Sequence, residues 1–162
     1  MIKDIFLFLD IDGVLNSKNF IASNSKSDND LYYPLDPEKV SYLNQIIELL
    51  EQDNFIVSVI LSSYWRLDFN IDQITDLLRE KGYVGPDIAD CTGECQNRGE
   101  EILQYYNEHK KVIKHILILD DDKDVFKISE SVGRWVCTDW ENGLLENHIS
   151  YAIKCANNVF SY

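Results

Sequence analysis

The chain of 162 residues is long enough to bury a substantial core, and we expect a single domain over residues 1–162. Its 45% of hydrophobic and 12% of aromatic residues are typical of a folded globular protein and exclude a disordered chain. Lys and Arg total 15 against 28 Asp and Glu, and the net charge of −13 argues against stable nucleic-acid binding, although it allows a local basic pocket for one phosphate.

Strand-like and helix-like segments alternate from the N-terminus onward. The apolar run "IFLFL" (5–9) indicates a strand covered on both faces, and it leads directly into "DIDG" (10–13). Residues 17–35 are rich in Ser, Asn and Asp, so we expect an exposed loop there, which could act as a flap. A helix then begins with Asp36 as its N-cap and Pro37 as its first residue.

The alternation continues through the middle of the chain. Residues 55–63, "FIVSVILSS", are rich in β-branched side chains and predict a second buried strand that ends in two serines. The pattern of residues 71–82 predicts a helix that Gly82 terminates. We expect a short third strand at "YVGP" (83–86) and a helix that begins near Gly99.

The last third of the chain repeats the opening pattern. In residues 115–124, "HILILDDDKD", an apolar strand again runs into carboxylates. Residues 134–139, "RWVCTD", predict a last strand, and residues 143–156 predict a closing helix. This order of elements predicts an α/β fold, with a parallel sheet flanked by helices on both sides. Ligands of such folds bind outside the carboxyl ends of the strands.

Three pairs of polar residues follow predicted strands and would therefore gather at one edge of the sheet. Each pair alone has an ordinary explanation, since aspartates often end strands, serines cap helices and acidic turns are solvated. The combination is much rarer by chance and favours a functional site. The pairs are Asp10 with Asp12, Ser62 with Ser63, and Asp120 with Asp121.

Four carboxylates in one small volume would raise each other's pKa unless a cation were present. A hard divalent ion such as Mg²⁺ relieves this repulsion, and it typically binds one or two carboxylates, waters and a phosphate oxygen. The other phosphate oxygens need donors, which a serine hydroxyl, backbone N–H groups near Gly13 and a cation such as Arg98 can supply. The candidate metal ligands are Asp10, Asp12, Asp120 and Asp121.

Two carboxylates two residues apart can also take two different catalytic roles. Asp10 could attack phosphorus and form an aspartyl-phosphate, which splits hydrolysis into two easier steps. Asp12 could protonate the leaving oxygen and then deprotonate the hydrolytic water. Alternation along an extended chain points the two side chains in different directions, and Gly13 permits the chain to turn around the substrate.

Over residues 6–124 the sequence resembles the four motifs of the haloacid dehalogenase (HAD) superfamily. They are "FLDIDGVLN", "ILSSYWR", the arginine of "NRGEEI", and "ILILDDDKD". Details such as "SSYWR", "NRGEEI" and "TDWENGL" look like the small HAD domains associated with bacterial nucleic-acid repair proteins. The resemblance implies a Rossmann-like three-layer sandwich and Mg²⁺-dependent phosphoryl transfer through an aspartyl-phosphate.

The resemblance also implies a role for each matching residue in the first three motifs. It makes Asp10 the nucleophile, and it makes Asp12 the general acid/base, whose backbone carbonyl also binds Mg²⁺. Ser62 is the phosphate-binding hydroxyl, a role that Ser63 could share or take. Arg98 stands where the family has a Lys or Arg that stabilises the phospho-intermediate.

In the fourth motif the resemblance identifies an acidic metal ligand. Asp121 matches it best, with Asp120 and Asp124 in support, and three consecutive aspartates leave the register open by one residue. Many relatives carry a cap domain after the first motif or before the third, but residues 17–35 and 83–97 are too short for one. We therefore expect an almost capless, open site, which in this family indicates a macromolecular end or a self-capping oligomer.

We therefore predict a phosphomonoester hydrolase with Mg²⁺ as its cofactor. Its substrate class is open among a small nucleotide, a nucleic-acid terminal phosphate and a phosphoprotein. Two alternatives remain: a non-catalytic Mg²⁺- and phosphate-binding regulatory module on the same fold, and acidic clusters that are merely solvated strand ends. Trp65 and Arg66 could line a substrate mouth where the indole stacks on a base, or Trp65 could pack against the next helix.

The sequence also bears on compartment. No apolar run approaches the roughly 18 residues that a membrane helix needs, and no signal-peptide cleavage pattern follows the N-terminus. The four cysteines include one close pair, "CTGEC", without a second pair to complete a zinc site, so we expect reduced thiols. We accordingly expect a cytoplasmic protein that is not bound to a membrane.

Overall fold

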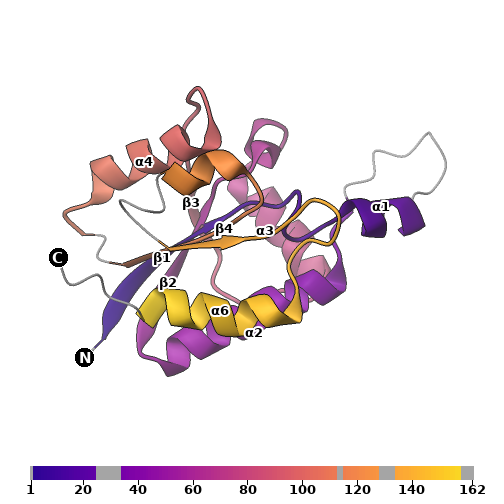
Figure 1. The fold of residues 1–162 in the computed structure, drawn as a ribbon, viewed down its shortest axis with the longest axis horizontal. Helices are drawn as coiled ribbons and strands as arrows, with labels where there is room; N and C mark the ends of the chain where they lie inside the picture. Colours follow the sequence, from indigo (N-terminus) through magenta and orange to yellow (C-terminus); the bar gives the residue numbers. More distant parts are fainter. Residues whose placement is uncertain (1, 25–33, 113–114, 128–133, 158–162) are drawn as a thin grey trace.

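The computed structural model describes residues 2–24, 34–112, 115–127 and 134–157. In these residues five strands form one sheet in the order β3-β2-β1-β4-β5, and every neighbouring pair is parallel (Figure 1). The predicted α/β fold with a parallel sheet is therefore confirmed. The strands are β1 (Lys3–Leu9), β2 (Phe55–Leu61), β3 (Ile88–Cys91), β4 (His115–Asp120) and β5 (Arg134–Cys137).

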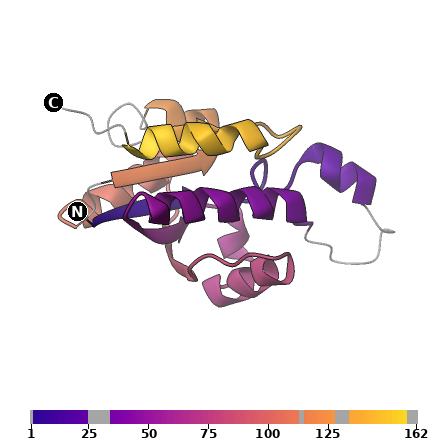
Figure 2. The ribbon, with the colours of Figure 1, turned by 90° about the horizontal axis from the view of Figure 1, so that it is seen from below.

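Helices cover both faces of this sheet, which gives three layers. α2 and α6 lie side by side on one face, and α4 covers the other (Figures 1 and 2). Between β1 and α2 the only helix that the described residues form is the short α1, so these residues hold no cap domain. The helices are α1 (Lys18–Asn24), α2 (Pro37–Gln52), α3 (Ile71–Glu80), α4 (Arg98–His109) and α6 (Glu146–Asn157), with short 3₁₀ helices η1 (Tyr64–Leu67) and η2 (Lys123–Val125).

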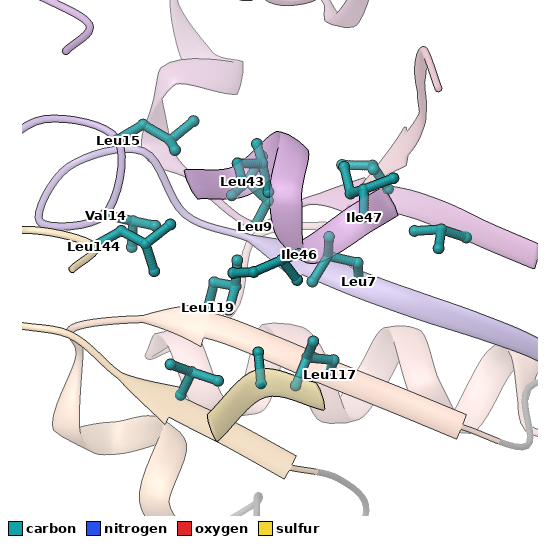
Figure 3. Packing of buried hydrophobic residues seen from close by; sticks show 14 of the residues in the cluster. Leu7, Leu9, Val14, Leu15, Leu43, Ile46, Ile47, Leu117, Leu119 and Leu144 are labelled. Atoms are coloured by element: carbon teal, nitrogen blue, oxygen red, sulfur yellow. The ribbon is translucent and has the colours of Figure 1, made fainter. Parts of the chain in front are cut away.

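Alternation along the strands sorts side chains between the two faces. Leu7 and Leu9 of β1 pack with Leu117 and Leu119 of β4 in the core that α2 and α6 cover (Figure 3). Phe8 of β1 belongs instead to the smaller core beneath α4. Even-numbered residues of the central strands therefore face α4. We call this side of the sheet the α4 face.

The helix predicted after residue 35 is confirmed as α2. The Asp36 carboxylate accepts the N–H of Glu38 at 3.0 Å and so caps the helix, and Pro37 occupies its first position. Val40 and Leu43 are fully buried, and burial of such a side chain stabilises the fold by roughly 1.5–3 kcal/mol. The apolar spacing of this helix therefore fixes which of its faces packs on the sheet.

The loop predicted over residues 17–35 is partly wrong, because Lys18–Asn24 form α1. The hydroxyl of Ser17 accepts the N–H of Phe20 at 3.2 Å and starts this helix. No residue of α1 is buried, so the helix carries no apolar periodicity that the sequence could reveal. The rest of the predicted flap, residues 25–33, lies outside the described residues.

The third strand is also misplaced in the sequence prediction. Residues 83–86 form a loop, in which the Tyr83 hydroxyl donates to the carbonyl of Pro86 at 2.7 Å. The strand begins at Ile88, two residues after Pro86, which has no N–H to donate to a sheet ladder. Among the described helices, none combines the length and the apolar character that crossing a membrane requires.

Candidate active site

The carboxyl ends of the three central strands present polar side chains on the α4 face. Asp10 and Ser62 directly follow β1 and β2, and Asp120 is the last residue of β4. Backbone bonds extend the sheet past the strand ends, from the Asp10 N–H to the Leu119 carbonyl at 3.0 Å and from the Ser62 N–H to the Leu9 carbonyl at 2.9 Å. All three polar residues have even numbers and are at most 5% exposed. The strand order reverses between β1 and β4, where ligands of such sheets bind.

Arg98, the first residue of α4, reaches into this group of side chains. Its Nη2 lies 3.7 Å from Oδ1 of Asp10, and its Nε lies 3.4 Å from Oδ2 of Asp120. The Asn97 side chain caps α4 by accepting the N–H of Glu100 at 3.0 Å. This cap fixes the start of the helix, and with it the position from which the Arg98 side chain projects. Arg98 is 3% exposed, so its charge acts on the two carboxylates through little solvent.

Glu101 joins Arg98 to Arg66 in a buried network that the sequence analysis missed. Its Oε2 lies 3.2 Å from Nη1 of Arg98, and its Oε1 lies 2.9 Å from Nη2 of Arg66. Arg66 also donates to the carbonyls of Ser62 and Ser63, at 3.3 and 2.7 Å. The Arg66 side chain is thus buried beneath the site and does not line a substrate mouth. The only sequence signal for Glu101 was its three-residue spacing from Arg98 on a helix.

Three carboxylates converge at the centre of the site. Oxygen atoms of Asp10, Asp120 and Asp121 all lie within 4.8 Å of one another, and we call these residues the acidic triad. Gly13 adopts a φ of +73°, and a Cβ there would overlap the Asp121 carboxylate. The turn after β1 therefore requires glycine at this position.

Burial dominates the electrostatics of the acidic triad. It raises the pKa of Asp10 to about 6, although the Arg98 guanidinium acts in the opposite direction. Burial and the neighbouring Asp10 charge raise the pKa of Asp120 well above its ordinary range. Burial also raises the pKa of Asp121. The protein thus holds these carboxylates together at a cost in free energy, which a cation bound between them would offset.

The donor set fits a hard divalent cation. The acidic triad offers only oxygen ligands. Oδ2 of Asp120 forms the 3.4 Å ion pair with Arg98 but accepts no hydrogen bond among the described residues. The four carboxylates of the triad and Glu101 outnumber the two guanidinium groups of Arg66 and Arg98, so a bound cation would relieve their mutual repulsion. The triad could therefore hold Mg²⁺.

Metal binding should appear as a pH-dependent rise in thermal stability. At a Mg²⁺ concentration about 100 times its Kd, we expect about 2.7 kcal/mol of stabilisation and a Tm increase of about 5–10 °C at pH 7.5. Without metal, stability should fall as pH rises from 3.8 to about 6, because folded Asp10 keeps a proton that the unfolded chain releases. The Mg²⁺ effect should therefore be smaller at pH 5, where protons compete.

Differential scanning fluorimetry with Mg²⁺, Mn²⁺ or EDTA at both pH values measures this effect. NaCl at matched ionic strength is the control for screening, and Asp121→Asn should reduce the Mg²⁺ response. If neither Mg²⁺ nor Mn²⁺ changes Tm, the acidic triad binds no divalent cation and the metal site is refuted.

Asp12 lies outside the acidic triad, on the exposed side of the turn after β1. Its Oδ2 accepts the indole N–H of Trp65 at 3.0 Å, and its Oδ1 accepts from Nδ2 of Asn16 at 2.7 Å. Trp65 is 7% exposed and packs against Phe69, with 6.1 Å between ring centroids. Its burial supports the packing interpretation of Trp65, and a buried indole offers no face for stacking on a base.

The two serines differ in what their hydroxyls contact. The Ser62 hydroxyl is fully buried and has no hydrogen-bond partner among the described residues. The Ser63 hydroxyl accepts the N–H of Trp65 at 3.4 Å and also bonds to Asp10, where it lowers the carboxyl pKa. Ser62 is therefore the hydroxyl with an unused donor at the site.

The N–H groups near Gly13 are largely used inside the turn. Gly13 donates its N–H to Oδ1 of Asn16 at 3.1 Å, and Ile11 donates to Oδ1 of Asp10 at 2.8 Å. In this conformation the Gly13 N–H is therefore not open to a phosphate.

A segment after β5 supports this turn from outside the four motifs. Thr138 donates its hydroxyl to the Gly13 carbonyl at 2.6 Å, and the Leu144 N–H donates to the Val14 carbonyl at 2.9 Å. Gly143 has a φ of +67°, and a Cβ there would come within 2.8 Å of the Asn16 carbonyl oxygen. This close approach explains the glycine of "TDWENGL", whose contacts are not visible in the sequence.

Comparison with known proteins agrees with this arrangement. Residues 6–149 match the family described as the HAD domain in Swiss Army Knife RNA repair proteins. No curated protein matches the chain. The family match spans β1 to the first residues of α6 and therefore includes all the side chains described above. The chain belongs to the family of HAD domains found in Swiss Army Knife RNA repair proteins.

Proposed function

We propose that the chain is a Mg²⁺-dependent phosphomonoester hydrolase that acts through an aspartyl-phosphate on Asp10. The observation that carries the proposal is the position of Asp10, beside Arg98 and inside an acidic triad at the end of the central strand. Membership in a HAD family supports the same chemistry. The alternative, a non-catalytic module that binds Mg²⁺ and phosphate, requires that this arrangement goes unused.

In the proposed first step, a carboxylate oxygen of Asp10 attacks phosphorus while the bond from phosphorus to the leaving oxygen breaks. Asp12 gives its proton to that oxygen. In the second step Asp12 takes a proton from water, which attacks phosphorus, frees the Asp10 carboxylate and releases inorganic phosphate. Mg²⁺ held by the acidic triad would neutralise charge on the phosphate and allow an anionic carboxylate to approach it.

Two residues are proposed to bind the phosphate oxygens. The Ser62 hydroxyl has no hydrogen-bond partner among the described residues, which supports its role as a donor, with Ser63 kept in its bond to Asp10. Arg98 supplies positive charge next to Asp10 and stabilises the phospho-intermediate. We propose that Gly13 acts mainly through its conformation, because its N–H is bonded to Asn16.

For the substrate, we infer a phosphate at the end of a nucleic acid or on a nucleotide. The family's RNA repair proteins and the absence of a cap in the described residues support this class. Tyr64 adds a specific observation, since it is 51% exposed and its ring centroid lies 4.6 Å from the Arg98 guanidinium. A base could stack on this ring. The net charge of −13 implies a transient contact with a nucleic-acid end and no stable complex.

A phosphatase screen tests the proposed function. The panel contains nucleotides, sugar phosphates, phosphopeptides and oligonucleotides phosphorylated at the 3′ or 5′ end, each with Mg²⁺ or with EDTA. We expect Mg²⁺-dependent release of inorganic phosphate, with the highest kcat/KM on nucleotides or oligonucleotide ends. Preference for phosphopeptides would indicate a phosphoprotein phosphatase. Binding of Mg²⁺ and phosphate analogues without turnover of any substrate would indicate the regulatory module.

The exposed ring of Tyr64 should determine affinity for nucleotides. Tyr64→Ala is expected to raise KM for a nucleotide or oligonucleotide end by about 10-fold, since stacking of one base contributes about 1–3 kcal/mol. KM for glycerol phosphate, which has no base, should change little. Tyr64→Phe keeps the ring above Arg98 and is the matched control. Equal effects of Tyr64→Ala on both substrates would show that the ring acts only through Arg98.

We also infer a cytoplasmic protein. All four cysteines are free thiols, which fits a reducing compartment.

A further inference from the structure

The carboxylate of Asp12 is held at both of its oxygens, although the residue is exposed. Trp65, from η1, donates its indole N–H to Oδ2 at 3.0 Å. Asn16, four residues along the turn, donates from Nδ2 to Oδ1 at 2.7 Å. A short side chain at an exposed turn would otherwise rotate among several rotamers. Here two donors from different segments restrict it to one.

Each donor is itself fixed by other contacts. Oδ1 of Asn16 accepts the N–H of Gly13 at 3.1 Å, so the amide must direct its NH₂ group at Asp12. Trp65 is buried against Phe69, and its backbone N–H donates to the Ser63 hydroxyl. An indole nitrogen can only donate, so it always offers a proton to the carboxylate.

We propose that Trp65 and Asn16 are positioning residues that hold Asp12 in place for proton transfer. The inference rests on the proposed function, because it takes Asp12 as the general acid/base. A carboxylate has about four lone-pair sites, so each oxygen of Asp12 keeps one for the proton that it gives or takes. Trp65 also directly follows the "SSY" segment that contains Ser62, so one segment positions both the phosphate ligand and the acid.

The competing explanation is that Trp65 merely fills space beneath the turn. Trp65→Phe separates the two explanations, because phenylalanine keeps an aromatic ring against Phe69 and removes the N–H. The leaving group supplies the readout. An alkoxide must be protonated as it departs, whereas 4-nitrophenolate departs readily without a proton, so only the alkyl ester depends strongly on a general acid.

We expect Trp65→Phe to lower kcat/KM for glycerol phosphate by roughly 10- to 100-fold and for 4-nitrophenyl phosphate by no more than about threefold. Asn16→Ala removes the other donor, and it should likewise lower kcat/KM more for glycerol phosphate than for 4-nitrophenyl phosphate. The matched control is Trp135→Phe, since the Trp135 indole N–H donates at 2.8 Å to the backbone carbonyl of Asp120 and not to Asp12. Its ratio of the two kcat/KM values should equal that of the wild type.

A double-mutant cycle gives an independent readout. If Trp65 acts through Asp12, Trp65→Phe should cause no further loss for glycerol phosphate in an Asp12→Asn background. Equal losses on both esters, or additive losses with Asp12→Asn, would overturn the inference and leave the proposed function intact. If the wild type releases phosphate from no substrate of the whole phosphatase panel with Mg²⁺, the proposed function fails and the inference fails with it.

Discussion

Asp10→Asn is expected to abolish phosphate release, with kcat at least about 1,000-fold lower than in the wild type, while the fold is retained. An amide of nearly the same shape cannot attack phosphorus, so no aspartyl-phosphate can form. Its oxygen can still accept the Ile11 N–H that Oδ1 of Asp10 accepts at 2.8 Å. Burial raises the pKa of Asp10 to about 6, so without metal the variant should be at least as stable as the wild type at pH 7.5.

Phosphate release with Mg²⁺ and urea denaturation in EDTA measure these two effects. Asp12→Asn is the matched control, because it keeps the nucleophile and removes the proposed acid/base two residues away. After mixing with 4-nitrophenyl phosphate, intact mass spectrometry should detect a phosphorylated protein in Asp12→Asn and none in Asp10→Asn. Full activity of Asp10→Asn in a preparation free of contaminating phosphatases would refute the covalent mechanism.

The core of the site was predictable because its signals are local. Asp10, Ser62 and Asp120 each end or follow a continuous apolar run, and parallel strands bring their carboxyl ends to one edge. Alternation also places all three on the α4 face, since β1, β2 and β4 run in register and the three residues share even numbers. The positions of these residues at strand ends, together with their even numbers, therefore predict the acidic centre from the sequence.

The side chains that support this centre were not predictable in the same way. Asn16, Trp65 and Glu101 act through hydrogen bonds whose partners are set by the packing of separate segments. A buried tryptophan two residues after a serine pair has the same local sequence whether its N–H donates to a carboxylate or to a carbonyl. The contact from Thr138 to Gly13 joins residues 125 positions apart and has no local signature at all.

The two errors in the fold have a common physical origin. α1 buries none of its residues, and of the four residues of β3 only Ile88 is buried. Both elements therefore lack the apolar periodicity from which helices and strands are recognised. Elements at the periphery of the sheet contribute little to the core, and their boundaries depend on local capping and on neighbouring strands.

Arg98→Met should cause a large loss of stability that depends on pH. Arg98 is the buried cation that contacts Asp10, Asp120 and Glu101, and its removal leaves buried carboxylates without that partner. We expect the free energy of unfolding to fall by about 3–5 kcal/mol at pH 7.5. Activity should also be lost, because the charge that stabilises the phospho-intermediate is gone.

The stability that Arg98→Met loses should be smaller at pH 5.5 than at pH 7.5, because the pKa values of Asp10 and Asp120 are already raised in the wild type. Without the guanidinium these pKa values rise further, so the folded variant takes up protons that the unfolded chain does not hold. Its stability therefore increases as pH falls through the folded-state pKa values, and the difference from the wild type narrows.

Urea denaturation in EDTA at the two pH values measures this narrowing. Arg79→Met is the control, because the ion pair of Arg79 with Asp87 is exposed and its removal should cost much less at either pH. An equal loss for Arg98→Met at both pH values would show that the methionine disturbs packing and not charge. If Mg²⁺ raises the stability of Arg98→Met at pH 7.5 by more than it raises that of the wild type, then the arginine and a metal neutralise the same carboxylates, because each lowers the cost of holding them ionised in one buried place.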